Sequence, residues 1–92
     1  MPSIRISRKH KKSIKEARSA VDRIAKAIAK KFDIEYVWDD NTLNFERAGV
    51  TGHIALEKGK VEVLAELSFL LGAIKSPIER EIVRHLDEQL GS

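Results

Sequence analysis

The chain has 92 residues, 42% hydrophobic and 34% charged, and it contains no cysteine. A disulfide framework and a thiolate metal site are therefore excluded, and the composition is typical of one folded domain spanning residues 1–92. The net charge of +3 hides an uneven distribution, because residues 1–31 hold eleven Lys and Arg against two acids. Residues 32–92 hold six Lys and Arg against twelve acids. This concentrated basic segment predicts an anionic partner.

The sequence shows no pattern typical of a leader peptide or a membrane span. The basic N-terminus is not followed by an apolar core of signal-peptide length. The longest apolar run, residues 63–74, includes Glu66 and is shorter than the roughly twenty residues that cross a bilayer. We therefore expect a cytoplasmic protein with no transmembrane segment, either soluble or associated with a surface.

The first two elements are a short strand and a long helix. Ile4 and Ile6 alternate with Arg5, which predicts a strand over residues 3–7, and a charged connector follows at residues 8–12. Ser13 and Glu16 then form a capping box at the start of a helix over residues 13–32. Its apolar residues recur at three- and four-residue steps and form one stripe, made of Ile14, Ala17, Val21, Ile24, Ile28 and Phe32.

Four short strands follow the helix. Alternation of apolar and polar residues predicts them at residues 34–38, 43–46, 51–57 and 61–67. The turns between them carry Asp39-Asp40-Asn41, Ala48-Gly49 and Lys58-Gly59, which are typical of tight hairpins. The four strands are therefore predicted to form an antiparallel meander.

A second helix is predicted near the C-terminus. Ser76 is its expected N-cap, Pro77 its first residue and Glu79 the partner in a second capping box. Its apolar stripe is Ile78, Ile82, Leu86 and Leu90, and Gly91 is expected to end it. Residues 68–75, just before it, are compatible with an extended strand, a helical turn or a buried connector.

The predicted order is β-α-β-β-β-β-α, which defines an α+β fold. Each helix has one apolar stripe, so both helices are expected on one face of a twisted antiparallel sheet. The first strand is expected to pair with the far part of the sheet, because the helix after it is long enough to cross. The layout resembles a reduced helix-grip domain, which is a likeness of architecture alone.

No pattern typical of catalysis or of metal binding is present. His10, His53 and His85 lie on different predicted elements, and no H-E-x-x-H motif occurs. His85 with Asp87 and Glu88 is more typical of a solvated helix face than of a metal site. The turn at Asp39 lacks the remaining ligands of a calcium loop, and neither a nucleophile elbow nor a phosphate-binding glycine loop is found. We therefore expect no enzyme activity, no metal and no cofactor.

The basic segment is the first candidate binding surface. It could bind nucleic acid or another anionic partner, or serve only as a solubilising surface. The aromatic residues lie at positions typical of a core, which disfavours base stacking and hence nucleic acid. The candidate residues are Arg8, Lys9, Lys11, Lys12, Lys15, Arg18 and Lys26.

The second candidate is the apolar segment Phe69, Leu70, Leu71 and Ile74. If exposed, it would form a patch suited to a partner or a hydrophobic surface. If buried, it would lie between the sheet and the last helix. The sequence leaves this choice open.

Several stretches together resemble one known family. They are IRISRKHKKSIKEAR near the start, FDIEYVW and LNFERAGVTG in the middle, and FLLGAIKSPIEREI near the end. These residues resemble the polyhydroxyalkanoic acid system family of small bacterial proteins, over nearly the whole chain. The resemblance implies an accessory role in the metabolism of this storage polyester. The implied partners are the granule surface or its coat proteins, and no catalytic residues are implied.

The sequence is therefore compatible with three functions. The first is a non-catalytic accessory protein of polyhydroxyalkanoate metabolism that binds granules or granule-associated proteins. The second is a nucleic-acid-binding or regulatory module that uses the basic face. The third is a carrier of a small hydrophobic ligand, which requires a cavity between the sheet and the last helix.

Overall fold

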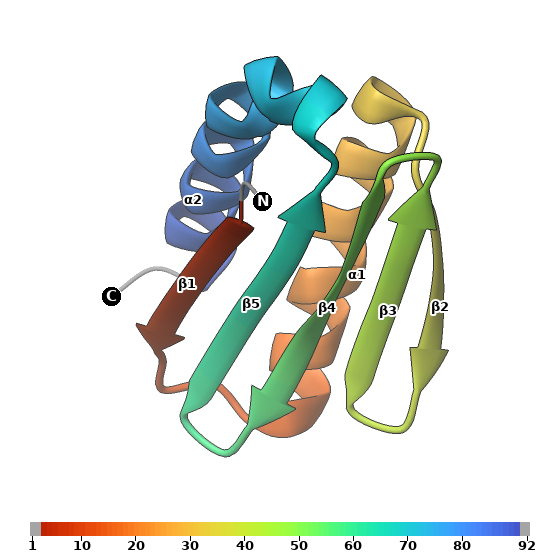
Figure 1. The fold of residues 1–92 in the computed structure, drawn as a ribbon. Helices are drawn as coiled ribbons and strands as arrows, with labels where there is room; N and C mark the ends of the chain where they lie inside the picture. The colour runs from red at the N-terminus through yellow and green to blue at the C-terminus, as the bar shows by residue number, and fades with distance from the viewer. Residues whose placement is uncertain (1–2, 91–92) are drawn as a thin grey trace.

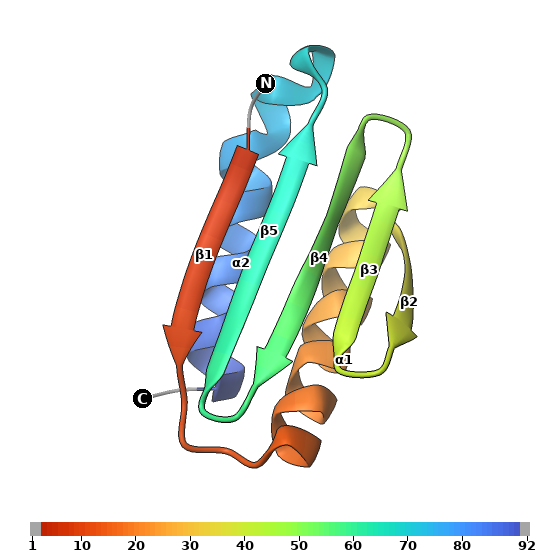
Figure 2. The same cartoon turned by 60° about the horizontal axis from the view of Figure 1, so that its bottom comes forward.

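The computed structural model describes residues 3–90, which form one antiparallel sheet covered by two helices (Figure 1). Both helices lie on the same face of the sheet, and the other face is open (Figure 2). The predicted α+β class, element order and layering are therefore confirmed. The elements are β1 Ser3–Lys9, α1 Ile14–Phe32, β2 Glu35–Asp39, β3 Thr42–Arg47, β4 Val50–Glu57, β5 Lys60–Leu67, the 3-10 helix η1 Phe69–Ile74, and α2 Lys75–Leu90.

The strand order is β1-β5-β4-β3-β2, and every neighbouring pair is antiparallel. The first strand thus pairs with the last one, with Ile4 opposite Ala65 and Ile6 opposite Val63. Since β1 and β2 occupy opposite edges, α1 crosses the sheet between them, as expected from its length. The other strands are joined by two-residue turns in which Asp40, Gly49 and Gly59 adopt positive φ angles of 55°, 87° and 80°.

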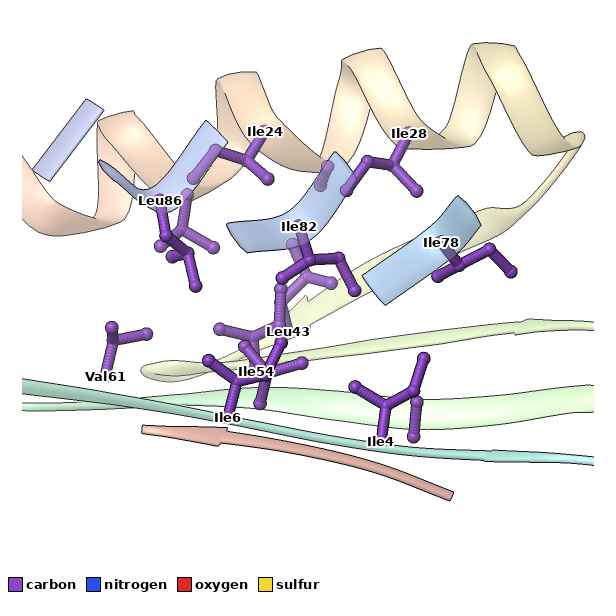
Figure 3. Packing of buried hydrophobic residues seen from close by; sticks show 14 of the residues in the cluster. Ile4, Ile6, Ile24, Ile28, Leu43, Ile54, Val61, Ile78, Ile82 and Leu86 are labelled. Carbon is purple, nitrogen blue, oxygen red and sulfur yellow. The ribbon is translucent and has the colours of Figure 1, made fainter. Parts of the chain in front are cut away.

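The core lies between the sheet and the two helices. Figure 3 shows Ile24 and Ile28 of α1 and Ile82 of α2 packing toward side chains that rise from the sheet, such as Ile54. The apolar stripes predicted for both helices supply these residues. Ile14 and Phe32, at the two ends of the first stripe, are only half-buried.

β1 is two residues longer than predicted. Arg8 and Lys9 belong to the strand and pair with Val61 and Lys60, so the charged connector is shorter than expected. His10 is only 8% exposed, and its backbone N–H donates to the carbonyl of Gly59 over 2.9 Å. The long partner strand β5 extends the pairing into residues whose charge suggested a loop.

The predicted start of the second helix is wrong. α2 begins at Lys75 directly after η1, so Ser76 is not its N-cap and no capping bond joins Ser76 to Glu79 among the described residues. Residues 68–75 adopt the helical-turn alternative, and the N–H of Lys75 donates to the carbonyl of Gly72. A helix that continues from a preceding turn has partners for its first N–H groups and needs no side-chain cap. Gly91, the predicted end of this helix, lies outside the described residues.

Glu81 links the two helices. Its Oε1 lies 2.6 Å from Nζ of Lys31 on α1, and its Oε2 lies 2.8 Å from Nη2 of Arg84. Nε2 of His85 lies 3.3 Å from the same Oε2. Hydrogen bonds from Lys31 and Arg84 lower the pKa of Glu81 to about 2, so the ionised form is stabilised in the folded state.

Gly52 permits close packing within the sheet. A Cβ atom at this position would lie 2.5 Å from the carbonyl oxygen of Leu64 and 2.6 Å from Cζ of Phe45. The ring of Phe45 therefore packs over the glycine in the space that a side chain would occupy.

We expect Gly52→Ala to lower the free energy of unfolding by about 1–3 kcal/mol, because the added methyl group meets backbone atoms that cannot move independently. Thr51→Val is the matched control, since the neighbouring side chain is exposed and should change stability by less than about 0.5 kcal/mol. Chemical denaturation measures both. Equal stability of the two variants would contradict this account of the packing.

Glu81→Gln should lower the melting temperature at pH 7. A lowered carboxyl pKa contributes stability that is complete above the ordinary value of 4.5 and is lost as the pH falls toward about 2. The difference in melting temperature between the wild type and the variant should therefore decrease as the pH falls from 4.5 to about 2. Glu88→Gln, an exposed change on the same helix, is the control. A difference in melting temperature of the same size at pH 7 and at pH 2 would refute the stabilising role of the ionised Glu81 side chain.

Candidate functional site

Phe69 and Leu70 form an exposed apolar surface at one end of the molecule, which we call the apolar end. Their exposed fractions are 85% and 88%, the highest among the large hydrophobic residues of the described chain. Leu71 and Ile74 instead pack against the core. The structure therefore divides the predicted apolar segment into two exposed residues and two that anchor them.

The apolar end is held in place by its neighbours. The N–H of Ser68 donates to the carbonyl of Gly49 over 2.7 Å, and the N–H of Leu71 donates to Ser68 over 3.0 Å. The Leu71 side chain packs on Gly49, where a Cβ would lie 2.5 Å from Cδ1 of Leu71. η1 is thus fixed between the β3–β4 turn and α2, and it presents Phe69 and Leu70 outward.

Three residues of the predicted basic face contact other side chains of the protein. Nε of Arg8 lies 3.6 Å from Oδ1 of Asp87 on α2, and Nζ of Lys26 lies 3.8 Å from Oδ2 of Asp22. Arg18 stacks on the indole of Trp38 at 4.6 Å from the ring centroid. These three predicted binding residues therefore have partners within the protein.

Trp38 and Tyr36 are connected to α1 through Asp22. The indole Nε1 of Trp38 donates to Oδ1 of Asp22 over 2.9 Å. Burial raises the pKa of the Tyr36 hydroxyl, and the negative charge of Asp22 raises that pKa further. Both aromatic rings pack against the core, and Arg18 covers Trp38, so neither is presented as a platform for bases.

The connector lysines gather with two lysines that the sequence analysis missed. Lys9, Lys11 and Lys12 lie beside Lys58 and Lys60 because β1 pairs with β5 and the connector bonds to the β4–β5 turn. We call these five residues the lysine cluster. Only the β1–β5 pairing brings its two parts together, and no local pattern signals that pairing. Lys15, the remaining predicted residue, lies on α1 beside Arg18 and Trp38.

The interior is almost filled. The cavity between the sheet and both helices has a volume of about 30 Å³ and is lined by apolar residues such as Ile28, Leu43 and Ile82. Pockets that bind small ligands are typically about ten times larger or more. The packing therefore opposes the hypothesis of a hydrophobic-ligand carrier.

The histidines are not brought together. His10 is buried at the β1–α1 connector, His53 lies on the open face of the sheet, and His85 contacts Glu81. Within residues 3–90, no group of three or more His, Asp or Glu is placed to hold a metal ion. Neither of the helices described is long and apolar enough to cross a membrane.

The two candidate surfaces lie at opposite ends of the molecule. Figure 2 shows η1 at one end of the long axis and the β1–α1 connector with the β4–β5 turn at the other. Fold and surfaces thus define a small α+β protein whose distinctive features are two exposed surfaces, one apolar and one basic.

The model of one protein family, described as "Putative polyhydroxyalkanoic acid system protein", matches residues 4–90, and the chain belongs to this family. The protein is thereby linked to the polyhydroxyalkanoate system, in agreement with the resemblance noted in the sequence. No curated protein and no solved structure gives a match. The helix-grip-like architecture therefore stays an inference from the order of the elements.

Asp22→Asn should lower the pKa of Tyr36 but leave it above the ordinary value of 10.0, because burial is the larger cause of the shift. Tyr36 is the only tyrosine, so an absorbance titration of tyrosinate reports it alone. Asp87→Asn, remote from Tyr36, is the control. An unchanged pKa in the Asp22 variant would contradict the contact between Asp22 and Tyr36.

Proposed function

We propose that the protein is a non-catalytic accessory protein of polyhydroxyalkanoate metabolism that binds the surface of storage granules through its apolar end. Its localisation is then cytoplasmic and granule-associated. The observation that carries this proposal is the exposure of Phe69 and Leu70 side by side on a fixed turn. Membership of the polyhydroxyalkanoic acid system family supplies the chemistry of the partner.

The geometry of the apolar end suits a surface rather than a pocket. Two neighbouring large apolar side chains project from η1, while Leu71 and Ile74 hold the turn to the core. Because the turn is already fixed, insertion into an apolar layer orders little additional backbone, and the entropic cost is small. A polyester surface or its amphiphilic coat would bury both side chains.

The expected attachment is weak and reversible. Complete burial of a Phe or Leu side chain contributes about 1.5–3 kcal/mol, so the two together correspond to a dissociation constant of roughly millimolar order. Granules expose a large continuous surface, on which many copies can bind. The same arithmetic predicts exchange between the surface and solution rather than permanent anchoring.

The α1 helix is a poor alternative for granule binding. Its apolar stripe, including Val21, Ile24 and Ile28, is buried against the sheet and α2. Exposing it to a granule would require the helix to leave the core. The apolar end needs no such rearrangement.

The non-catalytic part of the proposal is supported by where the reactive side chains lie. The three histidines occupy different elements. Within residues 3–90, the one close contact between a histidine and a carboxylate joins His85 to Glu81, and Glu81 is also bonded to Lys31 and Arg84. This arrangement links two helices and leaves no oxygen of Glu81 without a cationic neighbour. Such a carboxylate is a poor general base, because its pKa is about 2.

Co-sedimentation with amorphous polyhydroxybutyrate particles tests the proposal. The wild type should sediment with the particles, and the double variant Phe69→Ser/Leu70→Ser should bind at least about tenfold more weakly. Both side chains are largely exposed, so the double variant should keep the wild-type melting temperature within a few degrees.

Val37→Ser is the matched control. Val37 is also a large exposed hydrophobic residue, 64% exposed, but it lies on β2 away from η1. This variant should bind the particles as the wild type does. Failure of the wild type to sediment, or equal losses in the two variants, would overturn the proposal.

A further inference from the structure

The lysine cluster contains a charge arrangement that is unfavourable for folding. Lys9 on β1 lies directly opposite Lys60 on β5, and like charges at directly opposed positions destabilise a sheet. Lys58 follows in the adjoining turn. The bond from His10 N–H to the carbonyl of Gly59 then places Lys11 and Lys12 next to that turn.

Most of this charge is not neutralised within the protein. Nζ of Lys60 lies 2.7 Å from Oε1 of Glu62. In the described part of the chain, no carboxylate oxygen lies within 4.0 Å of Nζ of the other four members, which are Lys9, Lys11, Lys12 and Lys58. The cluster therefore carries a concentrated positive field toward solvent.

A concavity of about 730 Å³ lies beside the cluster. This volume is within the range of ligand-binding sites. It is lined by Lys9, His10, Lys11, Lys12, Glu16, Gly59 and Leu90.

Glu16 supplies a carboxylate to the lining, but that carboxylate is held in the helix cap. Its Oε1 accepts from the N–H of Ser13 over 3.2 Å and from Oγ of Ser13 over 3.1 Å. These bonds lower the pKa of Glu16. The remaining polar side chains of the lining are all cationic or imidazole.

His10, another residue of the lining, has an unpaired ring nitrogen. Its Nδ1 accepts from the N–H of Lys12 over 3.1 Å, so the proton of the neutral ring lies on Nε2. This Nε2 is buried and has no hydrogen-bond partner among the described residues. Because this atom is closed to solvent, an anion in the concavity would bond to it only after a rotation of the ring.

We propose that the concavity beside the lysine cluster binds a small anion that carries several phosphate groups. Lysine ammonium groups bind phosphate oxygens as mobile point charges. Three of them, Lys9, Lys11 and Lys12, line the concavity, and Lys58 and Lys60 lie next to it in the adjoining turn and strand. The lining contains no Phe, Tyr or Trp, His10 is only 8% exposed, and Trp38 is covered by Arg18. This composition favours a compact oligophosphate over a stacked nucleic-acid strand.

Titration of the full chain with inorganic triphosphate, followed by amide chemical shifts, tests the site. Binding should be saturable at about 50 mM salt and several-fold weaker at about 200 mM. The largest shifts should fall on Lys11, Lys12 and Gly59. The triple variant Lys11→Gln/Lys12→Gln/Lys58→Gln should weaken binding by about tenfold or more.

The control removes equal charge from the outward face of α1. The triple variant Lys15→Gln/Arg23→Gln/Lys26→Gln should change triphosphate affinity by less than about twofold. A second readout uses Lys9→Gln, which removes one of the two opposed charges. This variant should keep or raise the melting temperature while weakening triphosphate binding. A gain in stability with unchanged binding would overturn the site.

Two further outcomes would contradict the proposal. The first is the absence of saturable triphosphate binding at low salt. An equal loss of triphosphate affinity in the two triple variants would likewise contradict the site, because it indicates general charge attraction. The second is that a mixed-sequence single-stranded oligonucleotide binds while triphosphate does not, which assigns the surface to nucleic acid. Both outcomes leave the granule proposal unaffected, because the apolar end lies at the other end of the molecule.

Discussion

The pairing of β1 with β5 is the contact on which the rest of this structure depends. It places the first strand at one edge of the sheet, while β2, the next strand along the chain, occupies the other edge. The segment between them must therefore cross the whole sheet, and α1 does so with its apolar stripe against the strands. α2 then fills the remaining area of the same face, between α1 and β1.

The same pairing also creates the basic surface. Without it, the lysines of the connector and those of the β4–β5 turn would be separated by some fifty residues of chain. Pairing of Lys9 with Lys60, together with the bond from His10 to Gly59, makes them neighbours. The contact that completes the sheet therefore also concentrates charge at one end of the molecule.

Features encoded by short stretches of sequence could be predicted. The capping box of Ser13 and Glu16, the apolar stripes of both helices and the three hairpin turns depend on residues a few positions apart, and all are present. Features that depend on distant residues were missed. His10 is buried because β5 extends the pairing of β1. The cap predicted at Ser76 failed for a local reason, because η1 directly before it continues into α2.

Which side chains of the candidate surfaces are exposed also depends on contacts between distant parts of the chain. Nothing near Arg18 in sequence indicates that it covers Trp38, and nothing near Phe69 indicates that it is exposed while Leu71 is anchored on Gly49. Each depends on which strand or turn lies beside it in the folded chain. The candidate surfaces are therefore properties of the assembled sheet and not of any single motif.

The placement of η1 at one end of the long axis has a consequence for orientation. The molecule measures about 37 × 24 × 21 Å. If Phe69 and Leu70 contacted the polyester, the long axis of the molecule would be perpendicular to the surface, and the covered area would be close to the smaller cross-section. The connector lysines would then lie at the far end of the long axis, away from the polyester. At physiological ionic strength the screening length is about 8 Å, so charges at that height respond to the solution and not to the surface beneath.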